Sequence, residues 1–163
     1  MTTECVHCRI DPTTHSFSKL TLHGPAHVFY TDFLRVKEYS PPQSIMDHLS
    51  ASLDPLEGQP WIWLLDCEHF AFRHASKAPY FLGLIRLFKE RYCGTLQGIY
   101  VLHGSSLLQS TLTLIMPLLD RNILSMIHYV RGSPLEITRQ FETLGWSLKE
   151  IKQILDRLLE NKV

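Results

Sequence analysis

The chain has 163 residues, of which 45% are hydrophobic and 20% are charged, a length and composition that fill one hydrophobic core but not two. Sixteen basic and sixteen acidic side chains give a formal net charge of zero, which excludes a strong overall attraction to nucleic acid or to an anionic membrane. We therefore expect a flexible lead-in over residues 1–17 and a single domain over residues 18–163.

The number of cysteines and the first residues of the chain indicate in which cellular compartment we expect the protein. Four cysteines in a chain of this length are too few for a disulfide scaffold, so a reducing environment is the simplest interpretation. Residues 1–5 lack the basic region and apolar run of a signal peptide, and no stretch reaches the ~18 apolar residues of a membrane span. We expect a cytoplasmic protein whose contact with membranes is at most peripheral.

The first regular elements are expected to be a hairpin and a helix. Residues 18–22 and 26–32 have strand composition and flank the turn signal His23-Gly24-Pro25. A helix is predicted to begin at Pro41-Pro42, because proline is tolerated in a first turn, and to end at Asp54-Pro55.

Three apolar runs between residues 61 and 130 determine the predicted fold class. The runs 61–65, 99–102 and 127–130 show no polar alternation, which is typical of strands covered on both faces. The segments between them, 76–92 and 105–119, have helical length and period, as the crossovers of parallel strands require. The sequence therefore predicts an α/β fold, with a mostly parallel sheet of about five strands and helices packed on it.

The segment 105–119 is unusual because none of its residues is charged. A helix without a charged face indicates burial, or exposure to something other than water. Pro117 is expected to bend or end this helix.

Two further helices are expected at the C-terminal end, over residues 134–143 and 147–161. The second one begins with Ser147 followed three residues later by Glu150, which is the pattern of a capping box.

Two groups of residues invite a catalytic or metal-binding interpretation. Cys5 and Cys8 have the spacing of zinc ligands, but no second pair completes a tetrahedral site, so we expect no metal and no cofactor. Asp66, Glu68 and His69 follow a predicted strand, where α/β proteins place catalytic groups, yet an aspartate there equally caps the following turn. No nucleophile-elbow motif is present, and we expect a protein that is not an enzyme.

The sequence from Tyr92 to Val130 resembles the CRAL-TRIO family of lipid-binding proteins. In that family a strand with the pattern hydrophobic-Tyr-hydrophobic-hydrophobic-Asn precedes a gate helix that ends in Lys-Pro-Phe-Leu-Asp; here residues 99–103 and 116–120 occupy these places. The resemblance extends over roughly residues 26–155. It departs from the family at Met116, where many members have lysine, and near Glu136, which lacks the lysine that phosphoinositide-binding members use. The short lead-in is similar to the minimal BCH-like branch, which lacks the N-terminal helical domain.

The resemblance implies a CRAL-TRIO-like (SpoIIAA-like) architecture and non-enzymatic binding of a lipid or another small hydrophobic ligand, for transfer or sensing. The gate helix would act as a lid with hinges at Gly104 and Pro117. The expected ligand-binding residues are Tyr100, Leu102, His103, Leu108, Thr111, Leu112 and Ile115.

Two alternatives remain open at this point. BCH-type members are associated with small GTPases and with self-association, so the chain is alternatively a protein-interaction module that carries no lipid. A STAS-like domain has a similar order of elements and a regulatory serine at a helix start, for which Ser76 is the candidate, although the aspartate-serine context is missing.

Overall fold

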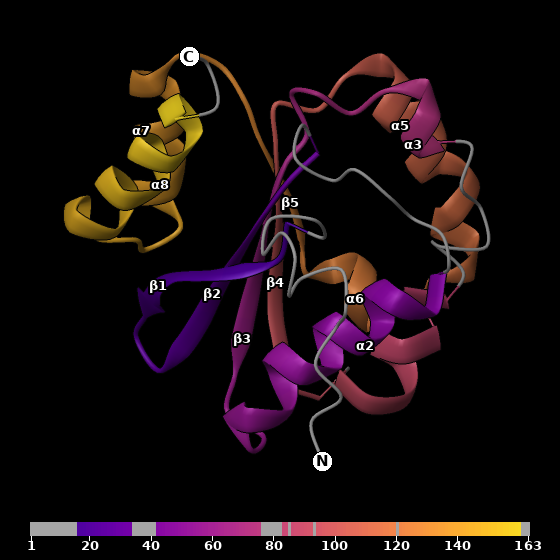
Figure 1. Ribbon diagram of the computed structural model, residues 1–163. Coiled ribbons are helices and arrows are strands. Elements are labelled where there is room, and N and C mark those ends of the chain that lie inside the picture. The colour runs from indigo at the N-terminus through magenta and orange to yellow at the C-terminus, as the bar shows by residue number, and fades with distance from the viewer. Residues whose placement is uncertain are drawn as a thin grey trace.

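The computed structural model describes residues 16–33, 42–75, 83–84, 86–92, 94–119 and 121–160 (Figure 1). The predicted candidates Cys5, Cys8 and Ser76 lie outside the described residues. Within the described part of the chain, no helix combines the length and the apolarity needed to cross a bilayer.

A five-stranded sheet forms the centre of the fold, and its strands are ordered as they occur in the chain. The strands are β1 (Ser18–His23), β2 (Ala26–Asp32), β3 (Trp61–Asp66), β4 (Leu96–Leu102) and β5 (Ile127–Val130). The first two strands are antiparallel and are joined by a tight turn that uses the left-handed backbone of Gly24 (φ 56°), while β2 to β5 are parallel. The predicted hairpin and the predicted mostly parallel sheet are both confirmed.

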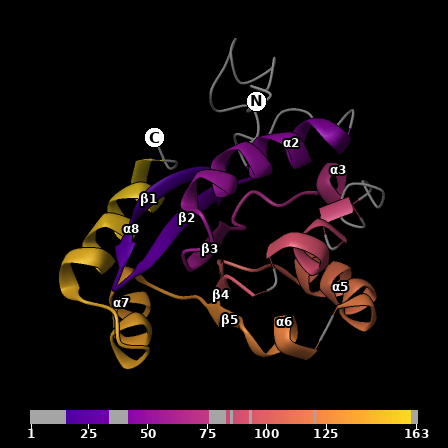
Figure 2. The same ribbon diagram turned by 90° about the horizontal axis from the view of Figure 1, so that it is seen from below.

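The helices lie on both faces of the sheet, as the two views in Figures 1 and 2 show. Because successive parallel strands are added in one direction, right-handed crossovers place every connecting helix on the same face. These connecting elements are α2 (Pro42–Leu53), η1 (Asp54–Leu56), α3 (Phe72–Ala75), the π-helical turn η2 (Phe88–Tyr92), α5 (Ser106–Ile115), η3 (Met116–Leu118) and α6 (Arg121–Ser125). The opposite face is covered by α7 (Pro134–Thr143) and α8 (Leu148–Glu160).

Two separate hydrophobic cores result, one on each face of the sheet. Along β3, Trp61, Trp63 and Leu65 belong to the core beneath the crossover helices, whereas Ile62 and Leu64 belong to the core beneath α7 and α8. Successive side chains of a strand point to opposite faces, so a strand that is covered on both faces needs an uninterrupted apolar run. The burial of both faces of the sheet therefore explains the apolar runs from which the fold class was predicted.

Several helix boundaries agree with the sequence. Helix α2 ends at Leu53, and α8 begins with the predicted capping box, in which the Ser147 amide donates to Glu150 Oε2 and the Glu150 amide donates to Ser147 Oγ. Helix α5 ends at Ile115, and Pro117 lies in the 3-10 turn that follows, as expected.

Other elements differ from the prediction. The short helix α6 was not expected. Of the helix predicted over residues 76–92, the structure describes residues 83–84 and 86–92: residues 83–84 and 86–87 are helical as predicted, and the last five residues form the π-helical turn η2. Ser16 and Phe17, which we assigned to the flexible lead-in, are buried: Phe17 stacks on Phe29, and Ser16 Oγ accepts a hydrogen bond from the Asp32 amide.

Candidate ligand-binding cavity

Helix α5 forms one wall of the candidate site, and its ends are defined by local hydrogen bonding. Ser105 is the N-cap: its hydroxyl accepts from the Leu108 amide at 3.2 Å. The hydroxyl of Thr111 donates to the carbonyl of Leu107 in the preceding turn at 2.9 Å. Because the helix satisfies this hydroxyl internally, the face of α5 that turns toward the sheet is effectively apolar.

Beneath α5 lies an apolar cavity of about 130 Å³. It is bounded by the sheet, by α5 and by the segments that follow β2 and β3. The lining residues are Thr31, Phe33, Trp63, Leu65, Cys67, Phe70, Leu84, Phe88, Ile99, Val101, Leu108, Thr111, Leu112, Ile115, Leu119, Ile123 and Ile127. The lining is formed by aliphatic and aromatic side chains with two threonines and one cysteine.

The few polar groups in this lining are satisfied by the protein itself. The indole Nε1 of Trp63 donates to Thr31 Oγ1 at 2.7 Å, and the thiol of Cys67 donates weakly to the carbonyl of Leu65 at 3.6 Å. Burial, with a smaller contribution from the nearby Asp66, raises the pKa of the Cys67 thiol well above its usual value. The thiol therefore stays neutral and is not an activated nucleophile.

Four of the predicted ligand-binding residues line this cavity, namely Leu108, Thr111, Leu112 and Ile115. The prediction that Tyr100 and Leu102 form its floor is wrong. Both side chains belong to the core under α7 and α8, where Tyr100 packs edge-on against Trp146 at 5.4 Å between ring centroids. Because side chains alternate along a strand, the floor is formed by their neighbours Ile99 and Val101.

His103 also lies away from the cavity. It takes a left-handed backbone conformation (φ 55°) directly after β4 and lines a groove on the α7 and α8 side. The two expected hinges, Gly104 and Pro117, stand just outside the two ends of α5. Their role as hinges stays a prediction.

Sequence reasoning missed the aromatic wall of the cavity, to which Phe33, Trp63, Phe70 and Phe88 contribute. Trp63 could have been found, because it lies two positions before Leu65 on the same strand. Its side chain therefore points to the same face of the sheet, toward the core beneath the crossover helices. Phe33 and Phe70 follow strands in irregular segments, where no periodic signal exists, and their rings meet at 5.1 Å between centroids in a T-shaped arrangement.

Of the three candidate catalytic residues after β3, Asp66 has a structural role. Asp66 is buried, and its carboxylate accepts from the hydroxyl of Tyr30 at 2.8 Å and from the amide of Glu68 at 3.2 Å. This is the turn-capping role that the sequence left open. Among the described residues, no three histidine, cysteine, aspartate or glutamate side chains cluster as metal ligands would.

In the comparison with known families, the model of the CRAL/TRIO domain matches residues 29–143. No curated protein matches the chain in sequence. The matched segment extends from β2 to the end of α7 and includes every residue that lines the cavity. This chain is therefore a member of the CRAL/TRIO domain family.

Proposed function

We propose that this chain binds an uncharged, apolar ligand, either a lipid chain or another small hydrophobic molecule, between the sheet and α5, and that it does so without catalysing a reaction. The observation that carries the proposal is the cavity beneath α5, whose described polar groups are already hydrogen-bonded within the protein. A polar group of a ligand placed there would lose its hydration without gaining a partner. The cavity therefore favours a hydrocarbon surface.

The size of the cavity limits what it holds with α5 in its present position. A volume of about 130 Å³ is close to the ~150 Å³ of an engineered apolar cavity that binds benzene. A ring or a few methylene groups fit this space, whereas a complete acyl chain requires α5 to move outward. Each methylene that becomes buried contributes about 0.8 kcal/mol, which offsets the loss of contacts made by α5.

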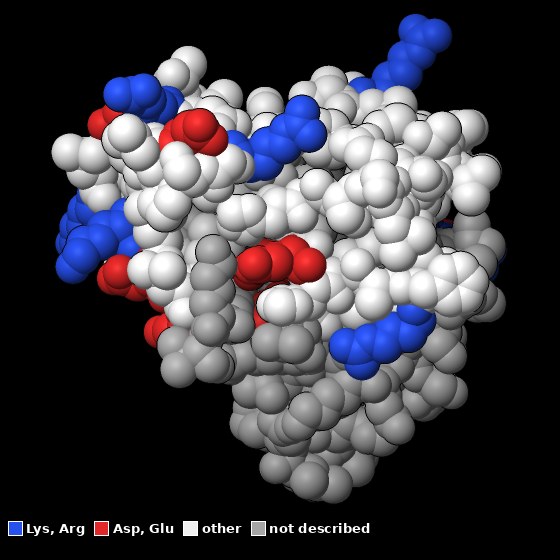
Figure 3. Space-filling model, turned by 90° about the horizontal axis from the view of Figure 1, so that it is seen from above, with Lys and Arg blue, Asp and Glu red and all other residues white. Residues whose placement is uncertain are grey.

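The surface beside the cavity suits loading from a membrane. Phe72 on α3 and Leu114 on α5 are 75% and 79% exposed, and these two helices are in contact. Figure 3 shows mainly uncharged atoms over the part of the surface formed by α3 and α5, whereas acidic and basic side chains alternate over α7 and α8. We propose that this mainly uncharged surface, to which α3 also contributes the exposed Arg73, contacts the membrane peripherally during ligand exchange.

The test is ligand uptake by the recombinant full chain. Native mass spectrometry, followed by organic extraction, is expected to find a bound apolar molecule, and a fluorescent fatty acid is expected to exchange into the cavity. Leu112→Trp fills the cavity and should abolish this exchange. Leu114→Trp introduces the same side chain on the exposed face of α5, outside the cavity, and keeps that face apolar, so it should leave the exchange intact. Equal uptake by both variants would remove this cavity from consideration as the site.

The small volume of the cavity also supports a second candidate, a protein-interaction module such as the BCH-like branch provides, with a small GTPase as one possible partner. Ligand uptake by the wild-type chain distinguishes the two candidate functions. A wild-type chain that carries no extractable lipid and takes up no apolar probe at saturating concentration would favour the interaction module.

A further inference from the structure

A larger groove lies on the other side of the sheet, between α7 and α8. Its volume is about 350 Å³. Buried side chains, including Ile137 and Ile151, form its floor, while its rim includes Leu148 and Leu159, which are 65% and 53% exposed. Large apolar side chains that remain exposed along a groove mark a surface that a partner covers.

Three exposed residues of this groove and the half-buried Leu155 form a regular stripe along α8. Leu148, Lys152, Leu155 and Leu159 follow one another at spacings of four, three and four residues, which is the spacing of a helix-pairing seam. A different face of the same helix, with Ile151, Ile154 and Leu158, is already buried in the core. Helix α8 therefore carries a second stripe beside its core face: Leu155 packs partly against the core, whereas Leu148, Lys152 and Leu159 stay exposed in the part of the chain that the structure describes.

We propose that the second stripe pairs with α8 of another copy of this chain, in antiparallel orientation across a two-fold axis. The stripe is symmetric about the point between Gln153 and Ile154: Leu148 and Leu159 are equidistant from it, and so are Lys152 and Leu155. A two-fold axis through this point places Leu148 against Leu159 of the second copy and the stem of Lys152 against Leu155 of the second copy. The same patch serves both partners, as an isologous interface requires.

Charge complementarity supports a second copy over other occupants. Lys152 and Asp156 both line the groove, and neither forms an ion pair within the part of the chain that the structure describes. In the antiparallel arrangement the ammonium group of Lys152 reaches Asp156 of the second copy, and the symmetric pair forms as well. Helix α8 carries three basic and three acidic side chains, so it offers no net charge to an anionic membrane or to a strongly charged protein.

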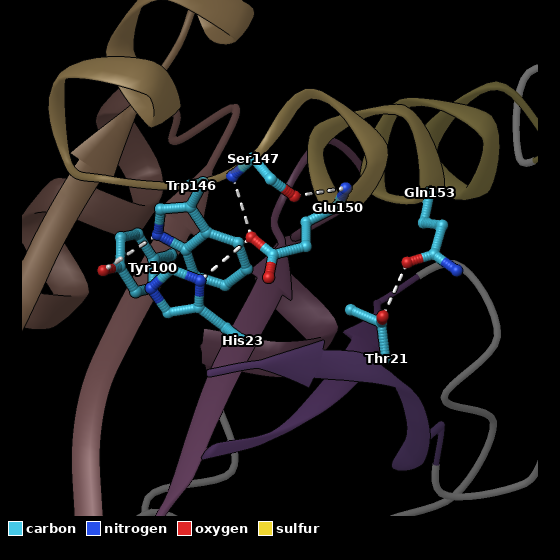
Figure 4. Close-up of polar contacts among 7 residues, drawn as sticks. All are labelled: Thr21, His23, Tyr100, Trp146, Ser147, Glu150 and Gln153. Atoms are coloured by element: carbon cyan, nitrogen blue, oxygen red, sulfur yellow. Dashed lines mark hydrogen bonds and ion pairs between the residues drawn. The ribbon is translucent and has the colours of Figure 1, made fainter. Parts of the chain in front are cut away.

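Helix α8 is held rigidly enough to present this face. Figure 4 shows that it is attached to β1 on its other side: His23 Nδ1 lies 3.0 Å from Glu150 Oε2, and the hydroxyl of Thr21 donates to Gln153. The ring of His23 also stacks on Trp146, with 4.0 Å between centroids. A preorganised helix loses little conformational freedom on pairing, which favours association.

The experiment is sedimentation velocity of the full chain over a range of concentrations, with circular dichroism to check folding. The wild-type chain is expected to form a dimer in a concentration-dependent manner, and Leu159→Glu is expected to shift it to monomer. Leu114→Glu, at an exposed leucine on the opposite side of the sheet, is the matched control and should leave the dimer unchanged. A wild-type chain that is monomeric at every concentration would overturn the proposal.

A charge exchange tests the two-fold geometry. Lys152→Glu and Asp156→Lys each create two like-charge contacts per dimer and should weaken association about tenfold or more. The double variant restores opposite charges within α8, where the two positions are four residues apart, and also across the proposed axis, so it should recover dimer formation. A double variant as weak as the single variants would overturn the antiparallel arrangement. Neither Lys152 nor Asp156 lines the cavity beneath α5, so fatty-acid uptake should be unchanged in these charge variants, and failure of the pairing would leave the proposed ligand binding untouched.

Discussion

The docking of α5 on the sheet can be tested by comparing two leucines of the same helix. Leu108 is 5% exposed and lines the cavity, whereas Leu114 is 79% exposed on the outer face. Leu108→Ala and Leu114→Ala make the same chemical change at these two positions. If α5 is held by its inner face, the first substitution should destabilise the protein strongly and the second should not.

The magnitude follows from the packing of Leu108. The substitution removes about three methylene equivalents, worth about 0.8 kcal/mol each, and the space left behind adds about 24 cal/mol for each Å³ that does not collapse. Because an existing cavity lies next to Leu108, the helix has room to settle, so we expect a total near the lower end of the usual range, about 3 kcal/mol. Leu114→Ala should cost less than about 0.5 kcal/mol, since its side chain is exposed.

Urea unfolding measures both values, and the melting temperature gives a second readout. For a chain of this size a loss of about 3 kcal/mol corresponds to a decrease of about 6–12 °C. The part of the new space that does not collapse adds to the existing cavity, so added benzene should raise the melting temperature of Leu108→Ala more than that of the wild-type protein. Equal destabilisation by the two substitutions would refute the assignment of the inner face of α5.

Three further predictions concern the sheet, pH and the cap of α5. Val101→Phe should fill the floor of the cavity and so reduce fatty-acid exchange. Leu102→Ala should lower the free energy of unfolding by about 2–5 kcal/mol but leave the exchange intact. The opposite result would restore the sequence-based assignment of Leu102 to the floor. Burial, together with the nearby Arg73, lowers the pKa of His74, whose Nδ1 accepts from the Ala71 amide. As pH decreases, His74 is therefore protonated in the unfolded chain before it is protonated in the folded protein, and the free energy of unfolding should fall below about pH 6.5. The urea midpoints measured at pH 7.5 and pH 5.5 should differ less in His74→Gln than in the wild-type protein. An unchanged difference would exclude His74 as the cause. Ser105→Ala removes the N-cap of α5 and should lower the free energy of unfolding, measured in urea, by about 1 kcal/mol. A free energy of unfolding equal to that of the wild-type protein would show that the cap does not stabilise the fold.

The order of elements could be predicted because burial on both faces leaves a plain pattern in the sequence. The runs 61–65 in β3 and 99–102 in β4 are apolar at every position, the run 127–130 in β5 is interrupted only by His128, and the structure confirms all three as parallel strands. The same property prevented a correct prediction of the cavity floor. When both faces of a strand are apolar, composition does not distinguish the face under α5 from the face under α7 and α8. Tyr100 and Val101 could be assigned to their faces only from the coordinates.

Contacts made by irregular segments were equally hidden from sequence analysis. Phe33 and Phe70 reach the cavity from segments that directly follow β2 and β3, and their positions depend on tertiary packing against each other. His74 is buried for the same reason, since its ring stacks with Phe70 at 5.6 Å between centroids. In contrast, the capping boxes of α7 and α8 are local and depend on residues only three positions apart, which is why Ser147 and Glu150 were identified correctly.

The two proposed activities are separated by the sheet, and this separation has a physical basis. An outward movement of α5 changes contacts in the core that contains Ile99 and Val101, whereas the groove beside α8 rests on the core that contains Tyr100 and Leu102. Strand β4 lies between β3 and β5 and is hydrogen-bonded to both, so it resists the displacement that would transmit a change from one core to the other. Ligand exchange on one face and pairing on the other can therefore proceed independently. By thermodynamic reciprocity, any influence of pairing on ligand affinity would have to appear equally as an influence of the ligand on pairing.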